Sequence, residues 1–548
     1  MIMAPSTGEV PLTSRVRDPG FTPSVRDLPK LLELIGTDDE ELATAVERAV
    51  LRIETQYRAR VVETVTAAAT AATRPARGRL AKLVGRLATG GAVEDAVRAW
   101  LLGALRDADP KTRRTAARSL GKLKPRTKSE AASTEKALLE AWDAAEGDDD
   151  RRALTEALGK IGSREALAKI SQGTPDKVAS RAAVMIERAA ARENPGRIDL
   201  SASRNAPIRF HTRAGLEGIV AEELGRVWKP ELRGPGVVEA TLDGPLASAA
   251  AIRTATHVGF PLARVVRRDD LAESIVETLL AREATSLFET FTKTGGAPIR
   301  FRLAWAQGGH RRALAWRCAE LVRERTKTLV NDPTDSTWEV VVDDRDGKLS
   351  IELVPRGFTD ERFAYRTGVV PASSHPTIAA ALARVAPRSD DDVVWDPFVG
   401  AGAELVERAR LGPAKALFGT DIEDEALAAA RKNLENAGVT ATLHRADALT
   451  FQPSRVTLII TNPPMGRRVQ RGAHTDLLER FVSHAAKVLV PGGAIVWTLP
   501  EARKIQARAE QEGFTVEGSV TVDMGGFPAE LCVYRLGGKR RRPAGGKT

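Results

Sequence analysis

The pattern of apolar and polar positions divides the chain into a helical part and a later part in which strands and helices alternate. From Leu28 to about Arg192 the sequence is rich in alanine and has almost no strand pattern, which predicts helices. Gly85, Gly121 and Gly159 lie 36 and 38 residues apart in this stretch, and each follows an arginine by eight positions (Arg77, Arg113 and Arg151). This period favours helix pairs stacked into a solenoid, because each pair buries its apolar face on the next. An irregular helical bundle is the alternative.

After a polar linker at residues 193–205, short alternating runs predict strands separated by helices. Ile208 to Thr212 alternates like a strand, and Gly215 to Val227 predicts a helix. Further strands are expected at Gly236 to Leu242, Ala263 to Arg267 and Lys348 to Val354. These elements predict an α+β region in the middle of the chain.

The C-terminal part has the pattern of a doubly wound parallel sheet. The apolar run Val393-Val394-Trp395 leads into Asp396-Pro397-Phe398-Val399-Gly400-Ala401-Gly402, and a helix is predicted from Ala403 to Arg410. A strand, a glycine turn and a helix in this order expose backbone to a nucleotide-like ligand, and glycine permits close approach. The next strand, Lys415 to Thr420, ends in Asp421, which stands 21 residues after Gly400. An acid at this distance usually binds ribose hydroxyls.

A glycine turn and an acid also suit a dinucleotide enzyme, but two features argue against one. Leu405 stands where the third glycine of the dinucleotide fingerprint would open a helix N-terminus for a pyrophosphate. The strand Val456 to Thr461 then runs into Asn462-Pro463-Pro464. Because successive prolines fix φ and cannot donate hydrogen bonds, the Asn462 side-chain oxygen and the Pro463 carbonyl become rigid acceptors. Such a pair suits a planar amine.

Composition limits the class of protein. A chain of 548 residues is too long for one core and suggests three or four domains. A formal charge of +10 and a pI near 9.6 favour an anionic partner. With only Cys318 and Cys532, neither a disulfide framework nor a thiolate metal site is expected, and no other cluster has metal-ligand spacing. No apolar run reaches membrane-spanning length and the segment from Met1 to Gly20 lacks an apolar signal core, so we expect a cytoplasmic enzyme without a membrane segment.

The motifs, taken together, resemble those of THUMP-domain class I S-adenosylmethionine-dependent RNA methyltransferases that modify the N2 amine of guanine. The resemblance is strong from about Gly357 to Leu536 and fair from Pro207 to Pro355. The run from Asp109 to Leu123 resembles a HEAT repeat. The resemblance implies a multidomain protein with α-helical HEAT-like repeats, a central α+β ferredoxin-like and THUMP region, and a Rossmann-like α/β methyltransferase domain with a seven-stranded mixed sheet.

The pattern and the resemblance together predict the domain boundaries. We expect a flexible leader at 1–27, HEAT-like repeats at 28–192, a ferredoxin-like domain at 206–268, a THUMP-like RNA-binding domain at 269–357, the methyltransferase domain at 358–538 and a basic tail at 539–548. The helical repeats are expected to be a binding platform without chemistry, with a protein as one possible partner.

The resemblance also assigns the site residues. S-adenosylmethionine would be bound by residues of the glycine turn, the ribose loop, the end of the third strand and the Asn-Pro-Pro motif (Asp396, Phe398, Gly400, Gly402, Asp421, Ile422, Asp447, Ala448 and Asn462). The catalytic set would be Asn462, Pro463, Pro464 and Met465. The family usually has a base-stacking aromatic residue where this chain has Met465, so Phe398 or Phe527 is expected to compensate.

A basic window in the predicted THUMP-like domain points to RNA as the partner. Basic residues crowd the segment from Lys293 to Lys327, and Trp305 and Trp316 lie among them. Such a patch neutralises phosphates. The residues expected to contact RNA are Arg300, Arg302, Arg311, Arg312 and Arg317. The alternative for this window is a solvated helix face with two core tryptophans.

We therefore predict methyl transfer to guanine N2 in tRNA or rRNA. An Asn-Pro-Pro methyltransferase acting on adenine N6 of DNA or on a protein glutamine amide shares the same nitrogen chemistry and is the first alternative. The second is a HEAT-type scaffold with an inactive methyltransferase domain.

Overall fold

The computed structural model describes residues 10–73, 76–173, 176–371, 373–465 and 473–538. The chain forms two compact units. One comprises the residues up to Pro195 together with 294–300 and 311–335, and the other comprises 196–293, 301–310 and the residues from 336 onward.

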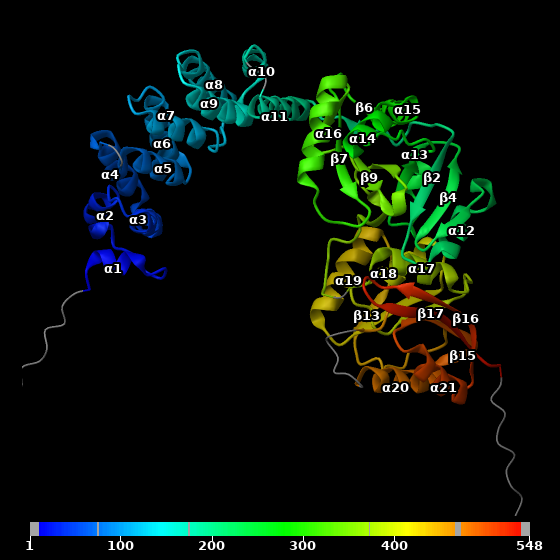
Figure 1. Ribbon diagram of the computed structural model, residues 1–548. Coiled ribbons are helices and arrows are strands. Elements are labelled where there is room, and N and C mark those ends of the chain that lie inside the picture. Colours follow the sequence, from blue (N-terminus) through cyan, green and yellow to red (C-terminus); the bar gives the residue numbers. More distant parts are fainter. Residues whose placement is uncertain (1–9, 74–75, 174–175, 372, 466–472, 539–548) are drawn as a thin grey trace, which may run out of the picture. The chain divides into compact units, whose positions relative to one another are not determined.

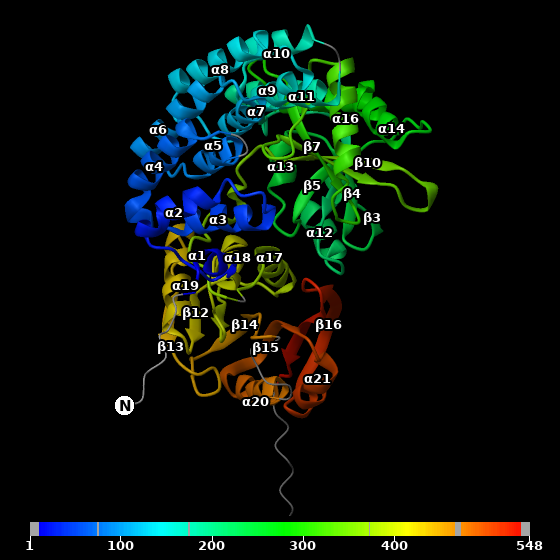
Figure 2. The ribbon, with the colours of Figure 1, turned by 60° about the vertical axis from the view of Figure 1, so that its left-hand side comes forward.

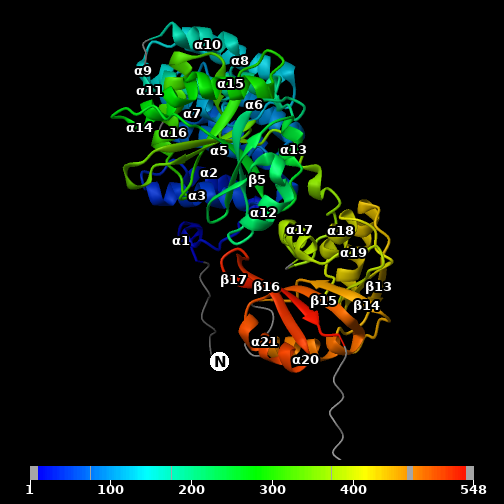
Figure 3. The same ribbon diagram turned by 90° about the vertical axis from the view of Figure 1, so that its right-hand side faces the viewer.

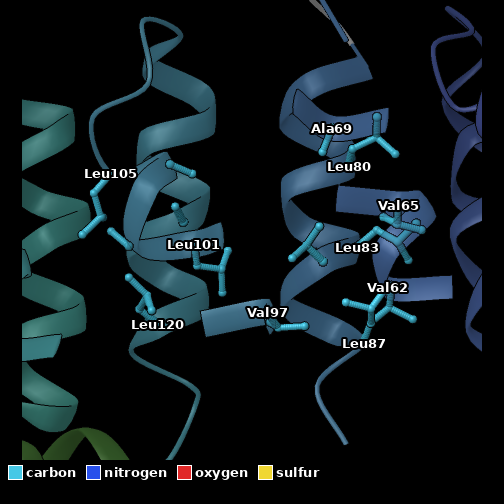
Figure 4. Packing of buried hydrophobic residues seen from close by; sticks show 14 of the residues in the cluster. Val62, Val65, Ala69, Leu80, Leu83, Leu87, Val97, Leu101, Leu105 and Leu120 are labelled. Atoms are coloured by element: carbon cyan, nitrogen blue, oxygen red, sulfur yellow. The ribbon is translucent and has the colours of Figure 1, made fainter. Parts of the chain in front are cut away.

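Stacked helices make up most of the first unit (Figures 1 and 2). They are α1 (Leu12–Arg17), α2 (Leu28–Leu34), α3 (Glu40–Arg52), α4 (Arg58–Ala71), α5 (Ala76–Arg86), α6 (Gly91–Ala104), α7 (Pro110–Leu120), α8 (Lys128–Asp143), α9 (Asp148–Ile161), α10 (Arg164–Ser171) and α11 (Lys177–Glu193). Helices α5, α7, α9 and α11 form an inner layer in which each contacts the next, and α4, α6, α8 and α10 form an outer layer against it. Fully buried side chains such as Val65, Leu83 and Leu101 fill the space between the layers (Figure 4).

The predicted repeat is confirmed by its contacts. Arg77 donates hydrogen bonds of 2.8 and 2.6 Å to Asp107, and Arg113 donates bonds of 2.8 and 2.5 Å to Asp150 in the same way. Each arginine also donates to carbonyl groups shortly before its own helix. The glycines permit close packing of the inner layer, since a Cβ at Gly121 would lie 2.8 Å from the Cα of Ala157. Equivalent approaches occur at Gly85 and Gly159.

The predicted flexible leader is wrong for its described part. Helix α1 contacts α3, and Val16 is buried in the same core as the repeats. The Ser24 hydroxyl accepts a hydrogen bond from the Arg26 N–H, and the Asp27 carboxylate accepts one from the Ser24 N–H, which forms a capping box before α2. A proline- and serine-rich composition therefore did not prevent this stretch from packing.

The predicted boundary at residue 192 does not end the first unit. Helix α11 contacts α16 (Arg312–Arg325) and β8 (Leu329–Asn331), which come from the predicted THUMP-like segment. Arg192 donates bonds of 2.5 and 2.6 Å to the fully buried Asp332, and the Arg188 guanidinium lies 4.8 Å from the ring centroid of Trp316. These charged and cation–π contacts join the helical array to a piece of chain that follows it by more than a hundred residues.

The predicted ferredoxin-like and THUMP-like segments share a single mixed sheet with the order β3-β4-β2-β5-β10-β9-β7-β8. Leu353 in β10 pairs with Phe260 in β5, so no sheet boundary falls at residue 268. The strands other than β8 are β2 (Ala206–His211), β3 (Glu231–Gly234), β4 (Val237–Leu242), β5 (His257–Pro261), β7 (Ile299–Trp305), β9 (Trp338–Asp343) and β10 (Ser350–Pro355). Two short strands, β1 (Arg197–Ile198) and β6 (Thr292–Lys293), pair separately. The helices of this region are α12 (Glu217–Leu224), α13 (Leu246–Ala250), α14 (Leu271–Leu280) and α15 (Arg282–Phe291).

The strand predicted at Ala263 to Arg267 is wrong, because the strand lies earlier, at β5. The backbone N–H groups of Ala263 and Val266 donate to the side chains of Glu283 and Thr278 instead of to a neighbouring strand. Side chains from α14 and α15 thus accept hydrogen bonds from backbone N–H groups that would otherwise pair with a neighbouring strand.

The seven-stranded mixed sheet predicted for the C-terminal domain is confirmed, with the order β13-β12-β11-β14-β15-β17-β16 (Figure 3). The first five strands are parallel and β17 is antiparallel to both of its neighbours. The strands are β11 (Val393–Asp396), β12 (Ala416–Asp421), β13 (Thr442–Arg445), β14 (Val456–Thr461), β15 (Leu489–Leu499), β16 (Phe514–Asp523) and β17 (Pro528–Leu536).

Helices cover both faces of this sheet, as its buried strands require. Val394 packs in the core formed with α17 (Pro376–Val385), α18 (Ala403–Arg410) and α19 (Asp424–Ala437). The next residue, Trp395, packs in the opposite core with α20 (Ala473–Val488) and α21 (Ala502–Gln511). The carboxyl ends of the central strands therefore meet at one edge, where open α/β sheets bind ligands.

Candidate active site

A cavity of about 600 Å³ opens at the carboxyl edge of β11, β12 and β14. Most of the predicted cofactor and catalytic residues line it (Phe398, Gly400, Asp421, Ile422, Asp447, Ala448, Asn462, Pro464 and Met465). Asp396, Gly402 and Pro463 are not on its wall. The segments that form the wall are far apart in sequence and are brought together by the parallel strands.

The glycine turn after β11 is fixed by the acid at the end of β12. Gly400 and Gly402 have φ values of 48° and 80°, which side chains with a Cβ rarely adopt. The Gly400 N–H donates a 3.0 Å hydrogen bond to Asp421, whose other oxygen accepts from the Glu423 N–H at 3.1 Å. Each carboxylate oxygen keeps a lone pair for a further donor. The arrangement suits a ribose held between the turn and the acid.

Asp396 lies beneath this turn and is fully buried. One of its oxygens accepts from the Thr461 hydroxyl at 2.7 Å and from the Phe398 N–H at 3.1 Å, whereas the other has no hydrogen-bond partner among the described residues. Burial, together with the nearby Glu404 carboxyl, raises the pKa of Asp396 well above its usual range. Burial also raises the pKa of Glu404, which lies on the cavity wall.

These two carboxyl groups fit a cationic ligand. S-adenosylmethionine carries a sulfonium and an ammonium group, and a nearby positive charge would favour the ionised carboxylates over their neutral forms. Asp421 would accept from its ribose, while Ile422 and Ala448 offer apolar surface and Asp447 a carboxylate for its adenine. The residues of the cavity therefore fit this cofactor.

The Asn462 side chain lines the same cavity and is hydrogen-bonded on both sides. Its Nδ2 donates to the Ser374 hydroxyl at 2.9 Å, and its Oδ1 accepts from the Thr498 hydroxyl. Ser374 in turn donates to Glu404. Since the hydroxyl proton of Ser374 is engaged by Glu404, its oxygen is left to accept from the amide nitrogen, which orients the Asn462 oxygen toward Thr498.

Ser374, Glu404 and Thr498 are functional candidates that sequence reasoning missed. Ser374 stands just before the predicted helix start at His375-Pro376. Thr498 lies near the end of a strand, and the residues next to it in the sequence are all buried. Nothing in the local pattern of either residue indicates a contact with Asn462. Glu404 follows the glycine turn directly, and this position was the available signal.

Phe527 does not line the cavity, so it is not the compensating aromatic residue. Phe398 does line it, and its ring packs 5.4 Å from that of Phe481. Met465 is half-buried on the wall. The wall of the cavity thus includes a thioether and a phenyl ring held by core packing.

The predicted RNA-contacting arginines differ in their surroundings. Arg300 is 3 % exposed and forms a 2.5 Å ion pair with Asp335, so the prediction that it contacts RNA is wrong. Arg302 is paired with Glu339 across the strands. Arg312 is exposed at the first position of α16, and Arg317 lies further along the same helix. Arg311 directly precedes the helix. Trp305 is buried, and the guanidinium groups of Arg181 and Arg188 lie over the ring of Trp316. Both tryptophans therefore have structural roles.

No group of three or more His, Cys, Asp or Glu side chains suited to a metal ion occurs in the described part of the chain. Within the same residues, none of the helices is both long enough and apolar enough to cross a membrane. The predicted basic tail at 539–548 lies outside the described residues.

Comparisons with known proteins match two parts of the chain to known families. Residues 364–528 match the family model of the RMKL-like methyltransferase domain, and residues 97–187 match that of HEAT repeats. A tRNA (guanine(6)-N2)-methyltransferase of Thermus thermophilus is 28% identical over 342 residues, which cover 59% of this chain and 98% of that protein.

A U6 snRNA (guanine-N(2))-methyltransferase, THUMPD2 of Bos taurus, is 32% identical over 142 residues, covering 25% of this chain and 28% of that protein. The crystal structure of TrmN from Thermus thermophilus aligns with a TM-score of 0.49 and 24% identity over 60% of this chain and 99% of that one.

Proposed function

We propose that this chain, which carries an S-adenosylmethionine-dependent methyltransferase domain of the RMKL-like family, methylates the exocyclic N2 amine of guanine in RNA. The observation that carries the proposal is the position of Asn462 on the wall of the same cavity as Gly400 and Asp421. A nucleoside-binding turn and a rigid amide acceptor thus face one space. The relatives named as guanine-N2 methyltransferases of tRNA and of U6 snRNA support guanine in RNA as the substrate.

The chemistry needs a neutral amine whose lone pair is released from conjugation with the base. When bound, the cofactor supplies an electrophilic methyl group. The Asn462 oxygen has two lone pairs, of which Thr498 occupies one, so the other can accept an N–H of the target amine. The Pro463 carbonyl directly follows Asn462 but is not on the cavity wall, and we propose it as the second acceptor on the basis of the family resemblance alone.

These two acceptors would stabilise the transition state more than the ground state. The amine nitrogen gains positive charge as its new bond forms, so its N–H groups become better donors and their hydrogen bonds strengthen. Alignment of the amine with the methyl group contributes by proximity. A strong base is not required, since the nitrogen becomes acidic as it gains charge.

The target base must be accessible on its pairing edge. The N2 amine takes part in base pairing, so the guanine has to be unpaired or flipped out of a stack to enter the cavity. We propose that Met465 and Phe398 pack against its face, with the thioether as the more adaptable of the two contacts. Arg311, Arg312 and Arg317 are proposed to contact the RNA backbone, in a cytoplasmic setting.

The proposal is tested by offering methyl-labelled cofactor with total tRNA, rRNA, DNA or protein in separate reactions. Label is expected in tRNA or rRNA. Label confined to DNA or protein would instead favour the adenine-N6 or glutamine-amide reaction of other Asn-Pro-Pro enzymes, and label in none of the four would favour an inactive scaffold.

A further inference from the structure

The helical array carries a basic residue directly after each repeat glycine. Arg86, Lys122 and Lys160 follow Gly85, Gly121 and Gly159 and therefore recur at the same 36- and 38-residue spacing. All three basic side chains are exposed. Because each glycine packs against the next inner helix, the residue after it recurs near the C-terminal ends of three successive helices, with Arg86 on α5, Lys122 just beyond the end of α7 and Lys160 on α9.

This place is on the face of the inner layer that points away from the core. On α5 the buried residues Leu80 and Leu83 face the outer helices, whereas Lys82 and Arg86 stand one turn apart with more than half of each side chain exposed (Figure 4). Arg118 on α7 is 48% exposed and stands four residues before Lys122, which lies just past the end of that helix, whereas the corresponding place on α9 is occupied by Glu156. Residues four apart share one face of a helix. We call Lys82, Arg86, Arg118, Lys122 and Lys160 the basic ladder.

The first two inner helices of the array differ in charge from the outer helices against them, whereas the next inner helix, α9, contains four acidic and three basic residues. Helices α5 and α7 of the inner layer each contain four basic residues and no acidic one. The outer helices against them, α4 and α6, contain both signs, with Glu63, Glu94 and Asp95 among their residues. A solvated surface without a ligand has no reason to separate charge in this way, since mixed signs keep a surface soluble.

Neighbouring acids neutralise only part of the ladder. Lys82 and Arg86 share the Glu47 carboxylate at 3.0 and 3.5 Å, and Arg118 pairs with Glu156 at 3.1 Å. Lys122 and Lys160 form no ion pair with any residue that the structure describes. The Arg118–Glu156 pair is exposed, so it contributes about 0–1 kcal/mol and can readily be exchanged for a stronger anionic partner, whereas Glu47 is buried beneath Lys82 and Arg86.

We propose that the basic ladder binds the phosphate backbone of the RNA substrate. The choice of RNA rests on the proposed function. Packed helices lie about 8–10 Å apart, so the ladder presents charge at regular intervals along the array. Large apolar side chains are not exposed on α5, α7, α9 or α11 in the part of the chain that the structure describes, so the apolar anchors of a protein interface are lacking. Backbone contacts of this kind add affinity and fix orientation without reading sequence.

The test compares two triple variants of the full chain that lose the same charge. One is Arg86→Ala/Lys122→Ala/Lys160→Ala, and the control is Arg60→Ala/Lys136→Ala/Arg164→Ala, whose residues are exposed on the outer helices. Binding of fluorescently labelled total tRNA is measured by anisotropy between about 50 and 200 mM salt, a range that resolves phosphate contacts.

The ladder variant should bind less tightly than the control, and its slope of log K against log salt should be shallower by about two to three. Its rate at saturating RNA should match the wild type. Equal affinities and slopes for the two variants, or no tRNA binding by the wild-type chain, would overturn the proposal. An unchanged slope together with selective loss of binding to acidic proteins would assign the face to a protein partner.

The methylated product is measured separately, so the two proposals can fail independently. Ladder-dependent tRNA binding without guanine methylation would leave the ladder standing and remove the proposed reaction. Guanine methylation together with tRNA binding that does not depend on the ladder would support the proposed reaction and remove the ladder.

Discussion

The helical array and the methyltransferase cavity are assembled from the chain in different ways. In the array, contacting residues stand about one repeat apart, as Gly121 and Ala157 do, and the same contact recurs along the unit. In the cavity, Ser374, Glu404 and Asn462 come from three different elements and meet once. A substitution in the array should therefore reduce stability locally and by degrees. One in the cavity should abolish the reaction, because no other residues in the protein form the same site.

The largest expected effect is that of Asn462→Ala, which removes one proposed acceptor for the amine. We expect kcat to fall by about 10²–10³-fold, the range for losing a hydrogen bond that strengthens in a transition state. Cofactor affinity should stay within several-fold, because the ribose contacts remain. The measurement is single-turnover transfer, with the exposed Asn436→Ala on α19 as control. Undiminished turnover would remove Asn462 from the mechanism. It would also contradict the expectation that substitutions in the cavity disable the reaction whereas those in the array do not.

A glycine substitution tests the array. The Cβ of Gly159→Ala would lie 2.7 Å from the Cα of Ala182, and overpacking of this kind costs about 1–3 kcal/mol. The control is Gly103→Ala in α6, where a Cβ meets nothing within 4 Å, so a gain of about 0.5–1 kcal/mol is expected. Hydrogen exchange should become faster in α9 and α11 only for Gly159→Ala, while kcat is retained. Equal exchange in both variants would mean that these glycines are not required for packing.

Ser374→Ala should have a smaller effect than Asn462→Ala, because it removes the partner of the amide and leaves the acceptor in place. A net hydrogen bond is worth about 0.5–1.5 kcal/mol, so we expect kcat to fall by up to about tenfold with little change in KM. Ser374→Thr keeps the hydroxyl and should restore most of the rate. A change in KM alone, or no rescue by threonine, would indicate that Ser374 shapes the cavity without orienting Asn462.

The smallest effect concerns pH and Asp396. Because its pKa is raised in the folded protein, Asp396 contributes stability that is present below its ordinary pKa near 4 and is lost as pH rises through the raised value. A cationic ligand favours the ionised form, so the increase in Tm caused by S-adenosylmethionine should grow as pH rises from about 5 to 8. Asp396→Asn should remove this dependence. The same pH dependence in both proteins would show that another group is responsible.

The same contrast explains what could be predicted from the sequence. The repeat was visible because Gly85 and Gly121 recur at a fixed distance, and the cavity was visible because Gly400 and Asp421 keep the spacing of a ribose-binding unit. The alternation of strands and helices predicted a doubly wound sheet, the family resemblance implied its seven mixed strands, and the strand order came from the structure alone.

Contacts between distant segments were not predictable in this way. Thr498 lies within a continuously buried strand, and its hydrogen bond to Asn462 depends on the pairing of β14 with β15. Arg300 belongs to a basic run, but its place in β7 buries it against Asp335. The N-terminal stretch has a composition typical of disorder, but Val16 packs in the core of the array and α1 contacts α3. In each case a tertiary contact overrode the local pattern.

The central claim is that the cavity offers a guanine N2 amine to the methyl group. The most direct test digests RNA that has been methylated by the purified protein to nucleosides and identifies the labelled product by chromatography and mass spectrometry. The account predicts N2-methylguanosine, and none of it when Asn462→Ala is used. Label in any other nucleoside, or N2-methylguanosine formed equally by Asn462→Ala, would contradict it.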